Sequence, residues 1–112
     1  MADFPTYLRV GPIVYRVVDW DYHAAHSVDR DGECDRANRI IRVREDLNGD
    51  DKARILLHEV LHACYSMGDL ADGDAEEKVV TVLANQLAQV WRDNPDFVRF
   101  MSASLGLTET DG

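Results

Sequence analysis

The chain has 112 residues, with 12 Lys and Arg against 21 Asp and Glu, which gives a formal net charge of −9. This length fits one small domain, residues 1–112, and a hydrophobic content of 46% suffices for a core without disulfide support. A charge this negative repels phosphate backbones and anionic lipid headgroups. Composition therefore argues against direct nucleic-acid binding and against a membrane as partner.

Two further features favour a cytoplasmic protein. The first ten residues lack a basic segment followed by an apolar one, and no stretch approaches the roughly 18 apolar residues of a membrane span. Cys34 and Cys64 are too few for a disulfide framework and form no CxxC pair. We expect both to be reduced thiols, with Cys64 in the core.

The first half of the chain is strand-like. β-Branched and aromatic residues fill 7–10 and 13–18 on either side of Gly11-Pro12, which predicts a hairpin or bent strand. A polar stretch, 19–31, follows, and residues 32–43 then show the pattern of a second hairpin. The sequence therefore predicts a sheet of three or four strands, antiparallel or mixed, within residues 6–43.

From Asn48 onward the pattern is helical. Asn48 or Asp50 can cap a first helix over about 50–67, with Gly68 placed to end it. A second helix is predicted over 74–92 and a short third one over 95–105, where Pro95 suits the first position. The fold class is thus α+β.

Each of the last two helices has an apolar stripe. The second helix carries Val79, Val80, Leu83, Leu87, Val90 and Trp91, and the third carries Phe97, Phe100, Met101 and Leu105. We expect these stripes to pack in the core, although part of the second one also suits a dimer face, so both a monomer and a homodimer are open.

The residues that point to chemistry lie in the first predicted helix, where His58-Glu59-Val60-Leu61-His62 forms an HExxH motif. Histidines four apart project from one face of a helix, so both imidazoles can bind one Zn²⁺ ion. Zinc lowers the pKa of a bound water to about 7, and Glu59 is placed to act as the general base that deprotonates it. The motif therefore predicts hydrolysis of a peptide bond without a covalent intermediate.

A catalytic zinc ion takes three protein ligands and a water, so one ligand is missing from the motif. No histidine follows His62. The remaining candidates are a downstream carboxylate, or else His23 or His26 from the polar stretch. Glu76 and Glu77, in the first turn of the second helix, suit a His₂Glu site, and helix geometry alone does not choose between them.

The chain resembles small glutamate-ligand zincins, similar to the ImmA/IrrE-type metallopeptidases and to compact HExxH proteins of phages and prophages. The resemblance covers about 33–94: a hairpin, the HExxH helix and a glutamate-led helix in the same order. The family's apolar-Ala pair, six and seven residues after its ligand glutamate, matches Leu83 and Ala84 if that ligand is Glu77. The resemblance thus implies a zincin-like minimal domain in which Glu77 completes the zinc site, and a protein or peptide substrate.

Other polar residues near the motif have simpler interpretations. His23 and His26 can stabilise a developing oxyanion, but the alternative is two histidines in a surface loop. Tyr65 shares the face of His62, where it can pack against the site or donate a hydrogen bond. Cys64 is turned about 200° from His62 and should point away from the metal.

The sequence favours two functions over a third, a helical adaptor that binds no metal. The first is a zinc metallopeptidase in which His58, His62 and Glu77 bind Zn²⁺ and Glu59 is the general base. The second is a zinc-binding interaction protein, of the phage or prophage type, that does not catalyse and acts by binding a protein partner.

Overall fold

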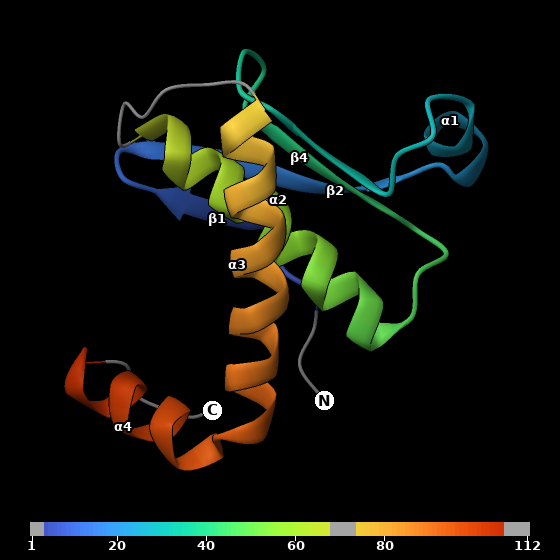
Figure 1. Cartoon of the computed structure of the whole chain (residues 1–112). Helices are drawn as coiled ribbons and strands as arrows, with labels where there is room; N and C mark the ends of the chain where they lie inside the picture. The colour runs from blue at the N-terminus through green and yellow to red at the C-terminus, as the bar shows by residue number, and fades with distance from the viewer. Residues whose placement is uncertain (1–3, 68–73, 107–112) are drawn as a thin grey trace.

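The computed structural model describes residues 4–67 and 74–106, which form four strands and four helices (Figure 1). In chain order these are β1 (Tyr7–Val10), β2 (Ile13–Trp20), α1 (Tyr22–Ser27), β3 (Gly32–Asp35), β4 (Ile40–Arg44), α2 (Gly49–Met67), α3 (Asp74–Asp93) and α4 (Pro95–Ser104). The α+β fold class is confirmed, and each predicted helix lies within one residue of its expected bounds. None of the helices described has the length and apolar character needed to cross a membrane.

The four strands form one mixed sheet in the order β1-β2-β4-β3. The hairpin of β1 and β2 is antiparallel and turns at Gly11, whose φ of 59° favours glycine. The hairpin of β3 and β4 is also antiparallel, and β4 pairs in parallel with β2. Both predicted hairpins are therefore present, and β3 is the edge strand on the side opposite β1.

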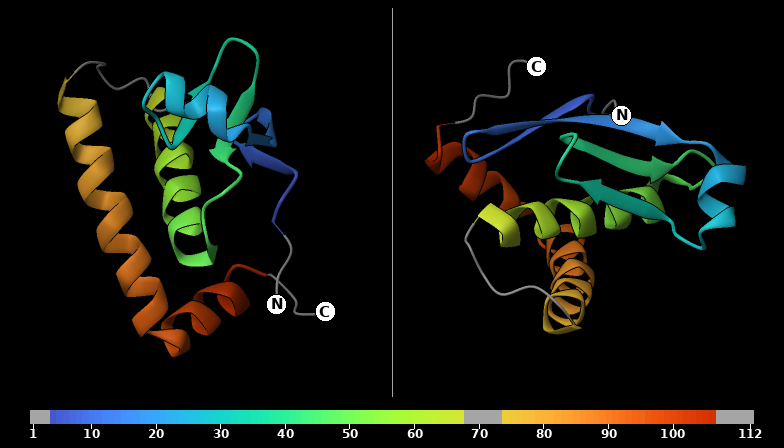
Figure 2. Two further views of the ribbon diagram at one scale, coloured as in Figure 1. Left: turned by 90° about the vertical axis from the view of Figure 1, so that its right-hand side faces the viewer. Right: turned by 90° about the horizontal axis from the view of Figure 1, so that it is seen from above.

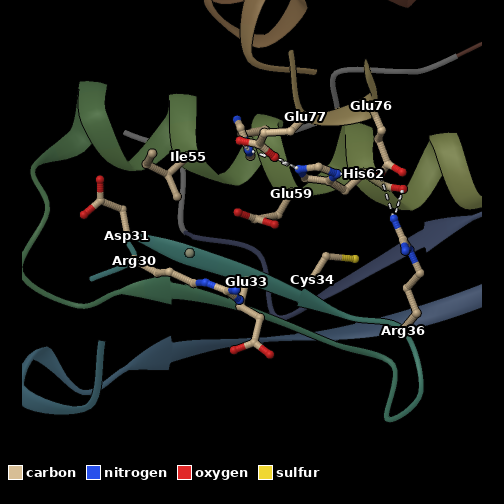
Figure 3. Close-up of a pocket in the computed structure, with 12 residues that line it drawn as sticks. Arg30, Asp31, Glu33, Cys34, Arg36, Ile55, Glu59, His62, Glu76 and Glu77 are labelled. Carbon is tan, nitrogen blue, oxygen red and sulfur yellow. Dashed lines mark hydrogen bonds and ion pairs between the residues drawn. The ribbon is translucent and has the colours of Figure 1, made fainter. Parts of the chain in front are cut away.

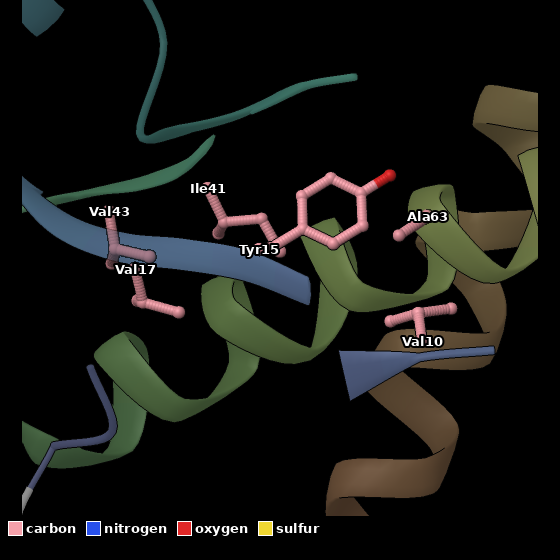
Figure 4. Packing of buried hydrophobic residues seen from close by; sticks show 6 residues of the cluster. All are labelled: Val10, Tyr15, Val17, Ile41, Val43 and Ala63. Carbon is pink, nitrogen blue, oxygen red and sulfur yellow. The ribbon is translucent and has the colours of Figure 1, made fainter. Parts of the chain in front are cut away.

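Helix α2 lies across one face of this sheet, and the core fills the space between them (Figures 2 and 4). The side chains that make up this cluster come from β1, β2, β4 and α2: Val10, Tyr15, Val17, Ile41, Val43 and Ala63. Asn48 caps α2, because its Oδ1 accepts the Asp51 N–H at 3.1 Å. The expected stop at Gly68 lies outside the described residues. The core thus fixes α2, and with it the HExxH motif, against the sheet.

The polar stretch between the hairpins is more ordered than expected. Strand β2 continues to Trp20, and Asp21 then caps the short helix α1 by accepting the Ala24 N–H at 3.1 Å. Ala25, in the middle of this helix, is fully buried. The cap of Asp21, the hydrogen bond from the Tyr22 N–H to Glu45 Oε2 at 3.1 Å and the burial of a small residue stabilise this short helix in an otherwise hydrophilic segment.

The predicted packing of the last two helices is wrong. Of the expected stripe on α3 only Val80 is buried, and the face that packs on α2 runs through Glu76, Val80 and Ala84. The residues expected on the stripe of the third helix, Phe97, Phe100, Met101 and Leu105, are exposed as well, and no residue of α4 is buried. Small side chains let α3 approach α2 closely, which places its larger apolar residues on other faces.

Candidate metal centre

The two histidines of the HExxH motif lie side by side on α2, one turn apart. Their Nε2 atoms are 3.2 Å apart, and both side chains are largely buried between α2 and α3. Burial is also the main cause that lowers the pKa of His58 below its usual value. Burial therefore favours the neutral form of His58, which is the form of imidazole that binds a metal.

Glu77, in the first turn of α3, places its carboxylate beside the Nε2 atoms of both histidines. Its Oε1 lies 2.8 Å from His62 Nε2, and its Oε2 lies 3.4 Å from His58 Nε2. Thr81, one turn along α3, donates its hydroxyl to Glu77 Oε2 at 3.2 Å, which orients the carboxylate. One ligand atom from each of His58, His62 and Glu77 falls within 4.8 Å of the others.

This arrangement fits a zinc ion. Zinc binds nitrogen and carboxylate oxygen at about 2.0–2.2 Å, so the ligand atoms of a tetrahedral site lie roughly 3.3–3.6 Å from each other. The two Nε2 atoms are 3.2 Å apart, and each lies near one oxygen of Glu77, His62 Nε2 at 2.8 Å from Oε1 and His58 Nε2 at 3.4 Å from Oε2, so small movements of these side chains would complete the site. Two imidazoles and one carboxylate use three positions and leave the fourth open.

Glu76 takes a different place from Glu77, although the two are neighbours in sequence. Its Oε2 accepts the proton on His62 Nδ1 at 2.7 Å, which is the ring nitrogen on the other side from the cluster. Arg36, in the turn between β3 and β4, donates to the same oxygen at 2.8 Å and to the carbonyl oxygen of His62 at 3.2 Å. The His62 hydrogen bond is the main cause that lowers the pKa of Glu76. Glu76 thus fixes which nitrogen of His62 faces the site.

Glu59 points from α2 toward β3 and into the same pocket as the cluster (Figure 3). It is 6% exposed, and this burial raises the pKa of its carboxyl group to about 7. Gly32 makes room for it: a Cβ at that position would lie 3.1 Å from Glu59 Oε2 and 2.7 Å from the Ile55 Cγ2 atom. A carboxyl group with this pKa can both accept and release a proton near neutral pH.

The pocket has a volume of about 760 Å³ and lies between α2, β3 and the start of α3. It is lined by Arg30, Asp31, Gly32, Glu33, Cys34, Arg36, Ile55, His58, Glu59, His62, Glu76 and Glu77. All four residues of the predicted site therefore line one cavity. Sequence reasoning missed Gly32 and Arg36, because their contacts with α2 and α3 are made across the fold and no motif marks them.

The other candidates lie elsewhere. His23 and His26 are exposed on α1, where both rings pack against Tyr22, and neither lines the pocket. Tyr65 is half-buried and does not line it either. Cys64 is exposed on α2, so its placement in the core is wrong, because the side of α2 that it occupies is covered by neither the sheet nor α3.

Comparison with known proteins does not assign the chain to a family. Neither models of protein families, nor curated proteins, nor solved structures give a match to the chain.

Proposed function

We propose that the protein is a zinc-dependent metallopeptidase, similar in its site to the ImmA/IrrE-type and phage-encoded zincins. The observation that carries the proposal is the convergence of His58, His62 and Glu77 at one point, with Glu59 buried in the same pocket. A site meant only to hold a structural metal closes all four positions with protein ligands. Here three ligands and a carboxylate with a raised pKa favour a site that handles a water molecule.

Each residue of the site has one role in the proposed hydrolysis. His58, His62 and Glu77 hold the ion, and Glu76 keeps the Nδ1 proton of His62 in place so that Nε2 stays free as a ligand. When bound, zinc supplies a lowered water pKa and polarises the carbonyl oxygen of the scissile bond. Glu59 accepts the proton of the attacking water and passes it to the nitrogen of the leaving amine. Cleavage of the C–N bond then yields a carboxylate and an amine.

The position of β3 supports a peptide as the substrate. This strand is at the edge of the sheet, and its residues Gly32, Glu33 and Cys34 line the pocket. An extended peptide can pair with the backbone of such an edge, and its scissile bond would then lie beside the pocket. A pocket with this much charge, on a domain of this size, suits a flexible polar segment of a protein better than a small apolar molecule.

The test compares zinc-loaded wild-type protein with Glu59→Gln, using a mixture of internally quenched peptides and fluorescently labelled casein as substrates. We expect cleavage by the wild type and a loss of about 10²–10⁴-fold in Glu59→Gln at equal zinc content. Glu45→Gln is the control for a lost carboxylate, because Glu45 is exposed and does not line the pocket. Equal cleavage by wild type and Glu59→Gln would refute the role of Glu59. Zinc binding without any cleavage would favour the interaction protein instead.

A further inference from the structure

The end of α3 and the whole of α4 form a segment, residues 85–104, that we call the helical arm. Helix α3 extends beyond α2, and α4 turns off from its end (Figures 1 and 2). Within α3, every residue from Asn85 onward is exposed except Ala88, which is half-buried. The arm therefore contributes almost nothing to the core that holds the sheet and α2 together.

The arm is nevertheless apolar. It exposes Leu87, Val90, Trp91, Phe97, Phe100 and Met101, with Trp91 at 60% and Phe100 at 67% exposure. At the usual areas of such side chains, these six together present roughly 600 Å² of accessible surface, three of them on α3 and three on α4. With the polar atoms between them, this approaches the roughly 800 Å² per partner of a standard protein interface.

Helix α4 also needs support that the described chain does not give it. It has ten residues and none is buried, whereas isolated helices shorter than about 12–15 residues are marginal in water. Helices of this length are stable in proteins because an amphipathic face packs against something. Phe97, Phe100 and Met101 provide such a face at positions i, i+3 and i+4.

The charge of the arm favours a second copy of this chain as its binding partner. The chain has a net charge of −9, but the arm contains two arginines and two aspartates and is therefore neutral. These charges are paired, Arg92 with Asp93 at 3.4 Å and with Asp50 of α2 at 3.5 Å, and Arg99 with Asp96. Two copies of an acidic chain repel each other wherever they meet through their charged surfaces, and the arm is a place where they can meet without that repulsion.

We propose that the helical arm is a homodimer interface, in which the arms of two copies pack on each other. The acidic surface excludes lipid headgroups and nucleic acid as occupants, and a protein partner recognised by charge would not favour a neutral segment. A two-fold pair brings the same residues together, which suits an interface without net charge. No residue of the arm lines the pocket.

Sedimentation velocity and light scattering on the full chain, over a dilution series, test this proposal. We expect a dimer for the wild type and a dissociation constant raised by at least about tenfold in Val90→Lys, because the substitution places a charge in the interface. Val14→Lys is the matched control, since Val14 on β2 is 39% exposed and Val90 is 40% exposed. Circular dichroism establishes that each variant is folded.

The proposal predicts dimers of wild type and Val14→Lys together with monomers of Val90→Lys. A wild type that stays monomeric across the series would overturn it, and so would a Val90→Lys variant that dimerises as tightly as the wild type. Zinc content should be the same in all three proteins, because Val90 does not line the pocket. The test therefore fails or succeeds separately from the metallopeptidase proposal.

Discussion

Replacing Glu76 by Gln should weaken zinc binding without removing a ligand. The substitution keeps the shape of the side chain but removes the charge that accepts the His62 Nδ1 proton at 2.7 Å. Because Glu76 is 5% exposed, water does not compete for this hydrogen bond. A hydrogen bond to a charged group contributes about 1.5–3 kcal/mol, which corresponds to about ten- to hundredfold in zinc affinity. This agrees with the usual effect of residues that orient a metal ligand.

Glu77→Gln removes a ligand oxygen and should weaken binding further than Glu76→Gln does. Zinc affinities are measured by competition with a chromogenic chelator, with Glu45→Gln as the control for a lost negative charge away from the pocket. The order expected from tightest to weakest is Glu45→Gln, Glu76→Gln, Glu77→Gln. If Glu76→Gln binds zinc as tightly as the control, Glu76 does not orient His62. If it binds more weakly than Glu77→Gln, the two glutamates have been assigned to each other's roles.

Three further predictions concern the pocket and the thiols. Gly32→Ala should displace Ile55 and the Glu59 carboxylate, because the new Cβ would lie 2.7 Å from Ile55 Cγ2. We expect the free energy of unfolding in urea to fall by about 1–3 kcal/mol and peptide cleavage to slow. A variant with unchanged stability and cleavage would contradict the close approach of α2 to Gly32. At pH 8 iodoacetamide should label the exposed Cys64 well before Cys34. Burial raises the pKa of Cys34 to about 11, so only about one Cys34 side chain in a thousand is a thiolate at this pH. Equal labelling of the two cysteines, measured by peptide mass spectrometry, would contradict the burial of the Cys34 thiol. In metal-free protein the pKa of Glu59 is about 7 in the folded state and about 4.5 in the unfolded state, so between these pH values the folded state binds a proton that the unfolded state has lost. The free energy of unfolding should therefore fall by about 3 kcal/mol as the pH rises from 4.5 to 7. This fall should be absent in Glu59→Gln, and the same dependence on pH in both proteins would refute the raised pKa.

The parts of the fold that follow from local pattern could be predicted from the sequence. Both hairpins have β-branched runs around turn residues, α2 has the capping side chain of Asn48, and α4 has a proline at its first position, so their bounds follow from local chemistry. Helix α1 was missed because its stability depends on Asp21 and the distant Glu45, which accept the N–H groups of its first turn, and on the burial of Ala25 by the rest of the fold. Its sequence carries no apolar stripe that would mark it.

The site was predictable where it depends on helix geometry and not where it depends on contacts across the fold. The spacing of His58 and His62 on one helix is enough to bring both rings together. The choice between Glu76 and Glu77 depends on how α3 is rotated against α2, which no periodicity in α3 reveals, because the buried face begins with a charged residue. The apolar stripe of α3 indicated the wrong face for the same reason. Glu76 lies on the buried face although it is charged, because its carboxylate is hydrogen-bonded there to His62 and Arg36.

The central claim is that His58, His62 and Glu77 form a zinc site. Elemental mass spectrometry on protein purified without chelator or added metal tests it most directly, with wild type and His62→Ala compared. The proposed site predicts close to one zinc per chain in the wild type and its loss in His62→Ala. A wild type that carries no zinc and takes up none on titration would contradict the claim, and a different metal at the same stoichiometry would contradict the assignment of zinc.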